Sequence, residues 1–161
     1  MDEQGTNSPR PTPPRGIFSA RVDDKGRLKL PSVFSEYFKA LNVDTVFITT
    51  LDLLQARIYT NPAWEHNENL FAKAGDASQD MQDIAFIANH YGADSEIDAQ
   101  GRVLFPTELR RELKLEGQQV WLDYFNGRIN VFDKERHDER MQRARVNLLD
   151  KLKTLERDGL K

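Results

Sequence analysis

The chain repeats one of its own segments. When the sequence is laid over itself with Val22 on Ile97, the ten residues that begin at Val22 align with the ten that begin at Ile97. Four of these positions are identical, and three more exchange one apolar residue for another. The register continues beyond the segment, where Phe34 meets Leu109. A repeat that stays in register predicts one supersecondary unit that the chain uses twice.

Each copy contains a strand–turn–strand pattern followed by a short helix. In the first copy, apolar residues alternate with Arg27 and Lys29 after a turn-like tetrapeptide, which predicts a hairpin with the preceding strand. Pro31 suits the first turn of the helix that follows. Further strands are expected at Val46–Thr49 and Arg57–Thr60. Short hairpins bury little apolar surface, so we expect each one to pair with strands of the sister copy or of another subunit.

Three helices are expected outside the two copies: Pro62–Lys73, Ser78–Tyr91 and Lys134–Arg157. The last of them has an apolar stripe, formed by Met141, Ala144, Leu148, Leu152 and Leu155. Such a stripe predicts packing in the core or contact with a partner. Acidic residues lie among the basic residues around it, which makes a membrane-surface helix the weaker interpretation.

Composition excludes several classes of protein. The absence of cysteine among 161 residues excludes a disulfide framework and thiolate metal or redox sites. The chain contains no stretch of about 18 apolar residues, and its first 15 residues, with four prolines, do not resemble a signal peptide. We therefore expect a cytoplasmic protein that does not span a membrane and that begins with a disordered, polar tail.

Charge is segregated along the chain. The net charge of −3 by itself argues against a nucleic-acid partner. Residues 21–40 nevertheless hold five basic and three acidic side chains, and residues 134–161 hold nine and six. Residues 61–98, in contrast, hold one basic and eight acidic side chains. Two parts of the chain are therefore basic, and the part between the two copies is acidic.

The repeated turn has the pattern Asp-x-x-Gly-Arg. Gly26 and Gly101 are expected at positive φ, which glycine adopts without a steric penalty. Asp23 and Asp98 are expected to accept hydrogen bonds from turn amides, or to brace the arginine four residues further on. A braced arginine presents a planar fork that fits a phosphate or a guanine edge. The alternative is that each Asp–Arg pair only holds its own turn together.

The two copies differ in the charge around this turn. Strand alternation places Arg27 and Lys29 on one face of their strand, away from its apolar residues. The second copy keeps Arg102 at the position of Arg27, but it has Glu96 in place of Arg21 and Leu104 in place of Lys29. We therefore expect its outer face to suit packing more than phosphate. The predicted DNA-binding residues are Arg21, Lys25, Arg27, Lys29 and Arg102.

Two tandem copies of Asp-x-x-Gly-Arg-x-x-x-Pro, the first beginning at Asp23 and the second at Asp98, resemble the MraZ family of bacterial transcriptional regulators, relatives of the AbrB-type swapped-hairpin proteins. The resemblance covers residues 16–157. It implies a mainly β fold with accessory helices, namely a double-split (swapped-hairpin) β-barrel built from two tandem pseudo-symmetric repeats, with a C-terminal helix. It divides the chain into a tail (1–15), a first AbrB-like repeat (16–63), a helical insert (64–91), a second AbrB-like repeat (92–133) and a C-terminal helix (134–161).

The same resemblance implies a function. Family members bind short direct repeats in the promoter of the division and cell wall gene cluster, usually repress it, and assemble into rings. The family's Asp-x-x-x-Arg motifs fall on two pairs: Asp23 with Arg27, and Asp98 with Arg102. Lys25 occupies the first motif's lysine, whereas Gln100 stands at that position in the second. The resemblance thus implies a nucleoid-associated homo-oligomer that binds double-stranded DNA.

Two alternatives are kept beside this interpretation. An enzyme needs convergent acid, base or nucleophile groups, but His66, His90 and His137 are widely spaced, and neither a Gly-rich phosphate loop nor an H-E-x-x-H pattern occurs. We therefore predict no catalytic residue, no metal and no cofactor. The second alternative is an oligomeric adaptor that binds protein through its C-terminal helix and has no affinity for DNA.

Overall fold

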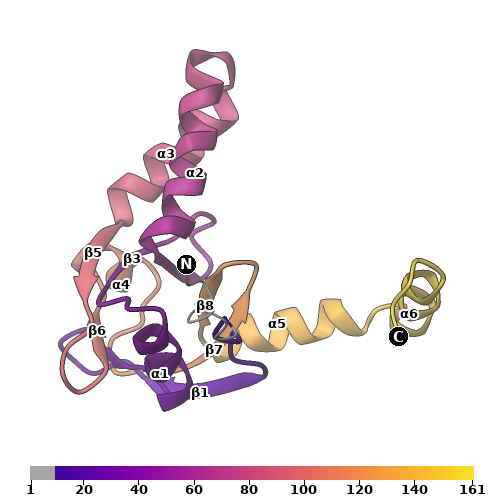
Figure 1. The fold of residues 1–161 in the computed structure, drawn as a ribbon, viewed down its shortest axis with the longest axis horizontal. Coiled ribbons are helices and arrows are strands. Elements are labelled where there is room, and N and C mark those ends of the chain that lie inside the picture. Colours follow the sequence, from indigo (N-terminus) through magenta and orange to yellow (C-terminus); the bar gives the residue numbers. More distant parts are fainter. Residues whose placement is uncertain (1–9) are drawn as a thin grey trace, which may run out of the picture.

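The computed structural model describes residues 10–161 and contains the same ββαββ arrangement twice (Figure 1). The first copy comprises β1 (Ile17–Arg21), β2 (Arg27–Lys29), α1 (Ser32–Ala40), β3 (Thr45–Thr49) and β4 (Ala56–Thr60). The second comprises β5 (Ala93–Glu96), β6 (Arg102–Leu104), α4 (Thr107–Glu112), β7 (Gln119–Phe125) and β8 (Arg128–Phe132). The prediction of one unit used twice is confirmed. Of the predicted tail, residues 1–9 lie outside the described part of the chain.

The two copies pair their strands with each other. All strands are antiparallel, in a six-stranded sheet of order β1-β7-β8-β4-β3-β5 and a two-stranded sheet of β2 and β6. Strand β1 pairs with β7, β5 with β3, and β2 with β6, so each of these pairs joins one copy to the other. The protein is therefore mainly antiparallel sheet with several helices, and the sister copy supplies the partner strands.

The predicted local hairpin around the first turn is present but very short. A single bridge, Val22 to Leu28, joins the segments on either side of that turn. The reason is the length of β2, because three residues cannot bury their apolar side chain against β1 alone. Pairing with β6 instead sets Leu28 opposite Val103, and both side chains are buried.

Residues at equivalent positions of the repeat are buried in both copies and share one core. These pairs are Phe34 with Leu109, Phe38 with Leu113, Val46 with Val120, and Ile48 with Leu122. The last two pairs follow a one-residue slip in the alignment. The shared core explains why these positions stay apolar in both copies, since both copies face the same interior.

Two helices between the copies form a projecting pair. Helix α2 (Asn61–Ala74) and helix α3 (Gln79–Tyr91) are joined by the short 3-10 helix η2 (Gly75–Ala77) and extend away from the sheet (Figure 1). Each begins at a side-chain cap, since Thr60 and Ser78 accept hydrogen bonds from backbone amides three residues on. The acidic stretch of the sequence therefore lies largely on this projection.

The C-terminal segment forms two helices, so the prediction of one continuous helix is wrong. Helix α5 (Lys134–Arg145) and helix α6 (Leu148–Arg157) are separated at Asn147, whose φ of 52° is left-handed. A left-handed residue cannot continue a right-handed helix. The leucines of the predicted stripe are exposed, with Leu148 at 56% and Leu155 at 52%, so they do not pack in the core of this chain. Within residues 10–161, no helix combines the length and the apolar character that crossing a membrane requires.

Candidate nucleic-acid interface

The first turn is closed by one aspartate that makes three hydrogen bonds. Asp23 Oδ1 accepts from the backbone N–H groups of Lys25 and Arg27, both at 2.9 Å. Its other oxygen, Oδ2, accepts from Arg27 Nε at 2.8 Å. Gly26, at a φ of 83°, donates to the carbonyl of Asp23 at 3.0 Å. The aspartate thus fills both predicted roles at once, because it caps the turn amides and braces the arginine.

The second turn has the same internal geometry. Asp98 Oδ1 accepts from the amides of Gln100 at 2.9 Å and Arg102 at 2.8 Å, and Oδ2 accepts from Arg102 Nε at 2.8 Å. Gly101 has a φ of 76° and donates to the carbonyl of Asp98 at 2.9 Å. Both glycines therefore adopt the positive φ that the sequence predicts.

Hydrogen bonding lowers the pKa of both aspartates. The largest cause at Asp23 is the backbone N–H of Arg27, and at Asp98 it is the backbone N–H of Arg102. The side chains of the same arginines lower each pKa further, below its ordinary value of 3.8. Both carboxyl groups are therefore ionised at neutral pH, and each holds an arginine Nε in a fixed direction.

Both arginine side chains remain accessible at their outer ends. The side chain of Arg27 is 39% exposed and that of Arg102 is 33% exposed. Among the residues that the structure describes, the terminal Nη groups of the two arginines make no hydrogen bond. Each guanidinium is therefore held at Nε and open at its fork, which suits a bidentate contact with a phosphate or a guanine edge.

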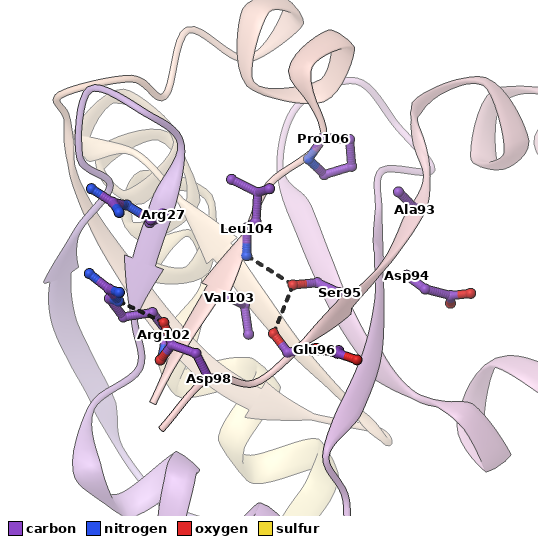
Figure 2. Close-up of a pocket in the computed structure, with 10 residues that line it drawn as sticks. All are labelled: Arg27, Ala93, Asp94, Ser95, Glu96, Asp98, Arg102, Val103, Leu104 and Pro106. Atoms are coloured by element: carbon purple, nitrogen blue, oxygen red, sulfur yellow. Dashed lines mark hydrogen bonds and ion pairs between the residues drawn. The ribbon is translucent and has the colours of Figure 1, made fainter. Parts of the chain in front are cut away.

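Strand pairing brings both arginines onto one surface. In the β2–β6 register, Arg27 lies opposite Leu104 and Lys29 lies opposite Arg102. These four side chains form the ribbon face, and the intervening residues of both strands are buried. Figure 2 shows Arg27 and Arg102 extending to the same side of this ribbon. A two-stranded β-ribbon is one of the elements that enter the major groove of B-DNA.

Backbone hydrogen bonds fix each turn to the other copy. The amide of Leu30, just after β2, donates to the carbonyl of Gly101, and the amide of Phe105, just after β6, donates to that of Gly26, both at 2.9 Å. The two turns are therefore held in a fixed relation at the ends of one ribbon.

A hollow of about 410 Å³ lies beside the ribbon, with arginines on one side and carboxylates on the other. Figure 2 shows the carboxylates of Asp94 and Glu96 across this hollow from the two arginines. Ser95 Oγ spans the gap between β5 and β6, because it accepts a hydrogen bond from the amide of Leu104 at 2.9 Å. The carboxylates repel phosphate, so the arginine side of the ribbon is the one that suits a nucleic acid.

The structure brings together part of the predicted set of basic residues. Three of them, Arg27, Lys29 and Arg102, share the ribbon face, and Lys25 is exposed on the adjacent first turn. Arg21 is exposed at the end of β1, in the other sheet, opposite Gln119. Leu104, for which the sequence favours packing, is 52% exposed.

Sequence reasoning missed Arg110, which contacts the first turn. This arginine lies on α4 of the second copy and is 17% exposed. Its Nη1 donates to the carbonyls of Lys25 at 2.8 Å and Phe105 at 3.1 Å, while Nε donates to Glu116 at 3.1 Å. The internal repeat contained a signal for this contact. Its alignment pairs Arg110 with Ser35, so the second copy has a large, charged residue where the first has a small, neutral one.

The histidines take no part in this surface. His137 stacks on Trp121, with ring centroids 5.4 Å apart, at the start of α5. Within residues 10–161, no three acidic or histidine side chains gather in a way that could hold a metal ion.

The fold and the candidate site are both built from the repeated unit. Two ββαββ units pair with each other's strands and present two aspartate-braced arginines on one ribbon. Residues 92–157 match the family described as "MraZ protein, putative antitoxin-like". The chain belongs to the MraZ family.

Relatives that carry the name Transcriptional regulator MraZ support this assignment. The protein from Acidobacterium capsulatum is 38% identical over 106 residues, which are 66% of this chain and 73% of that protein. The one from Koribacter versatilis is 34% identical over 105 residues, or 65% and 71% of the two chains. The one from Legionella pneumophila strain Paris is 32% identical over 125 residues, or 75% and 80%.

Proposed function

We propose that the protein is a transcriptional regulator that binds double-stranded DNA through the ribbon face. The observation that carries the proposal is the β2–β6 pairing, which sets Arg27, Lys29 and Arg102 side by side with the forks of both arginines open. The relatives are named as transcriptional regulators, and the protein is accordingly not an enzyme.

Each basic residue has a role in this proposal. Arg27, fixed at Nε by Asp23, contacts a guanine edge or a phosphate, and Arg102 makes a weaker contact of the same kind. Phosphate contacts come from the exposed lysines of the first copy, Lys25 and Lys29, and from Arg21. The DNA target is the set of direct repeats in the promoter of the division and cell wall gene cluster, which the bound protein represses. This places the protein in the cytoplasm, on the nucleoid.

Self-assembly into a ring completes the proposal. A few phosphate contacts give only weak, salt-sensitive attachment, whereas several linked ribbons gain affinity through effective concentration. Support comes from α6, which exposes four leucines that suit another copy: Leu148, Leu149, Leu152 and Leu155. The cross-copy strand pairs support a swapped-hairpin, double-split barrel, with residues 16–63 and 92–133 as its two halves.

The decisive experiment is DNA binding measured by fluorescence anisotropy. A labelled promoter fragment with several direct repeats is compared with a shuffled fragment at about 50 mM and about 200 mM salt. We expect tighter binding to the repeats and a steep loss of affinity at the higher salt, because bound cations release counterions from phosphates. Lys73→Ala, on the acidic projection, removes one charge away from the ribbon and is expected to bind as the wild type does.

Two outcomes would contradict the proposal. No binding to either fragment at the lower salt would favour the oligomeric adaptor. A monomeric mass in solution, with and without the promoter fragment, would remove the ring while leaving the DNA contact to be judged by anisotropy.

A further inference from the structure

The two turns are packed against different side chains. At Gly26, an added Cβ would collide with the guanidinium end of Arg110. At Gly101, the nearest atom is Cβ of Ser35, at an ordinary contact distance of 3.5 Å. Ser35 and Arg110 are equivalent positions in the repeat. Arg110 of the second copy thus packs against the first turn, and Ser35 of the first copy packs against the second turn.

Arg110 joins three parts of the protein. Its Nη1 bonds the carbonyl of Lys25, in the first turn, and the carbonyl of Phe105, at the end of β6. Its Nε bonds Glu116, in the loop after α4. Since the amide of Phe105 also bonds the carbonyl of Gly26, the first turn is tied to β6 by both backbone and side chain.

The second turn has the equivalent backbone hydrogen bond but no equivalent of the side-chain hydrogen bonds from Arg110 within the described residues. The carbonyl of Gly101 accepts from Leu30 just as that of Gly26 accepts from Phe105. The hydroxyl of Ser35, however, donates to the carbonyl of Ser32 within its own helix. A serine at this position is also too short to bridge a turn and a strand end in the way that Arg110 does.

We propose that Arg110 is a positioning residue that fixes the first turn before DNA binds. This role rests on the proposed function. It makes the first turn the preorganised DNA contact and the second turn the adaptable one. Arg110 acts through Arg27, because it holds the carbonyl of Lys25 two residues before it. A turn that is already ordered loses less conformational entropy on binding, which raises affinity without adding a contact.

Amide hydrogen exchange tests the positioning directly, without DNA. Arg110→Lys keeps the charge but cannot form the same fork of hydrogen bonds. We expect it to speed exchange at Lys25, Gly26 and Arg27, and to leave the matching amides of the second turn unchanged. Equal acceleration at both turns would show a general loss of stability and would overturn the proposal.

DNA binding tests the consequence. We expect Arg110→Lys to weaken binding by about three- to tenfold, which corresponds to ordering one or two groups on association. The salt dependence should keep its slope, because Arg110 positions the turn and does not contact phosphate. Arg111→Ala, the neighbouring exposed arginine on α4, is the control for charge and is expected to have a smaller effect. Wild-type affinity in Arg110→Lys would overturn the proposal.

A gain-of-function variant guards against a simple folding defect. Ser35→Arg places an arginine over the second turn, where we expect slower exchange at Gly101 and tighter DNA binding. In this background, Arg102→Ala should weaken binding by more than it does in the wild type. If the added arginine slows exchange and leaves DNA binding unchanged, preorganisation does not govern affinity and the proposal fails.

The proposal and the DNA-binding function fail in different ways. If the wild type binds no DNA, the proposed function is wrong, and the positioning role of Arg110 is overturned with it even if exchange at the first turn responds. If the wild type binds DNA and Arg110→Lys changes neither exchange nor affinity, the function stands and only the positioning role is wrong.

Discussion

The two turns are alike inside and different outside. Each has an aspartate that accepts two amides and an arginine Nε, and each has a glycine at positive φ. Around the first turn lie Lys25, Lys29 and Arg110, and at the equivalent places around the second lie Gln100, Leu104 and Ser35. Both copies thus keep the residues that the backbone of the turn requires, and they differ in the residues that face a partner or the other copy.

The largest expected effect is that of Arg27→Ala on DNA binding. Losing a good bidentate base contact costs about 1–3 kcal/mol, or roughly a fivefold to 150-fold loss of affinity. Anisotropy titration of the promoter fragment measures the loss, and sedimentation checks that the oligomer keeps its mass. Loss of assembly together with DNA binding would mean that the Asp–Arg pair only holds the fold.

Alanine at the two glycines separates the turns by stability. Gly101→Ala forces a left-handed alanine, which costs about 1–2 kcal/mol. Gly26→Ala carries the same penalty and must also displace Arg110, so its Tm is expected to fall further. Calorimetry on both variants measures the difference. A larger fall in the Tm of Gly101→Ala would contradict the packing difference described above.

Arg102→Ala is expected to weaken DNA binding less than Arg27→Ala does. The second turn has Gln100 where the first turn has Lys25, and it lies nearer the carboxylates of Asp94 and Glu96. A loss of about 0–1 kcal/mol is expected, because fewer cations surround this contact and the nearby carboxylates repel phosphate. Titration under the same conditions as for Arg27→Ala makes the comparison. Equal losses would show that the two copies have not diverged in role.

Leu104→Lys makes the outer strand face of the second copy more like that of the first. The new lysine takes the position equivalent to Lys29 and lies opposite Arg27 on the ribbon face. DNA affinity at low salt should rise a few-fold, and the slope of affinity against salt should steepen by about one. An unchanged slope would indicate that this end of the ribbon does not face phosphate.

The smallest expected effect concerns the pH dependence of the two aspartates. Each pKa is lowered below 3.8 in the folded protein, so each carboxylate adds stability above the unfolded pKa and loses it as pH falls through the folded pKa. Carbon-detected NMR titration should give both midpoints below 3.8. In Arg27→Ala the midpoint of Asp23 should rise only part of the way, because the backbone N–H at position 27 remains, and that of Asp98 should not move. A full return to the ordinary value would mean that the side chain provides most of the shift.

The sequence predicted the elements better than their partners. Alternation and the internal repeat located the strands, the turns and most of the helices, since these depend on local pattern. They also gave Asp23 with Arg27 and Asp98 with Arg102, whose contacts span only four residues. The local hairpin is shorter than the sequence suggests, because β2 pairs along its length with β6 of the other copy, where Leu28 lies opposite Val103.

Two other features also lay beyond local pattern. The break at Asn147 interrupts an apolar stripe that continues on both sides of it, so periodicity alone does not reveal it. The contact of Arg110 with the first turn joins residues 85 positions apart. In the sequence, Arg110 appears only as a mismatch with Ser35.

By itself the sequence determined that this protein carries one unit twice, and that each unit contains a turn closed by aspartate, glycine and arginine. These properties follow from spacing and from the conformational freedom of glycine, which act over a few residues. Tertiary structure alone decided that strands β2 and β6 pair across the copies, and so which cations share a surface. The physical reason is that short strands are stable only where two copies bury their apolar sides together, which is a property of the folded whole.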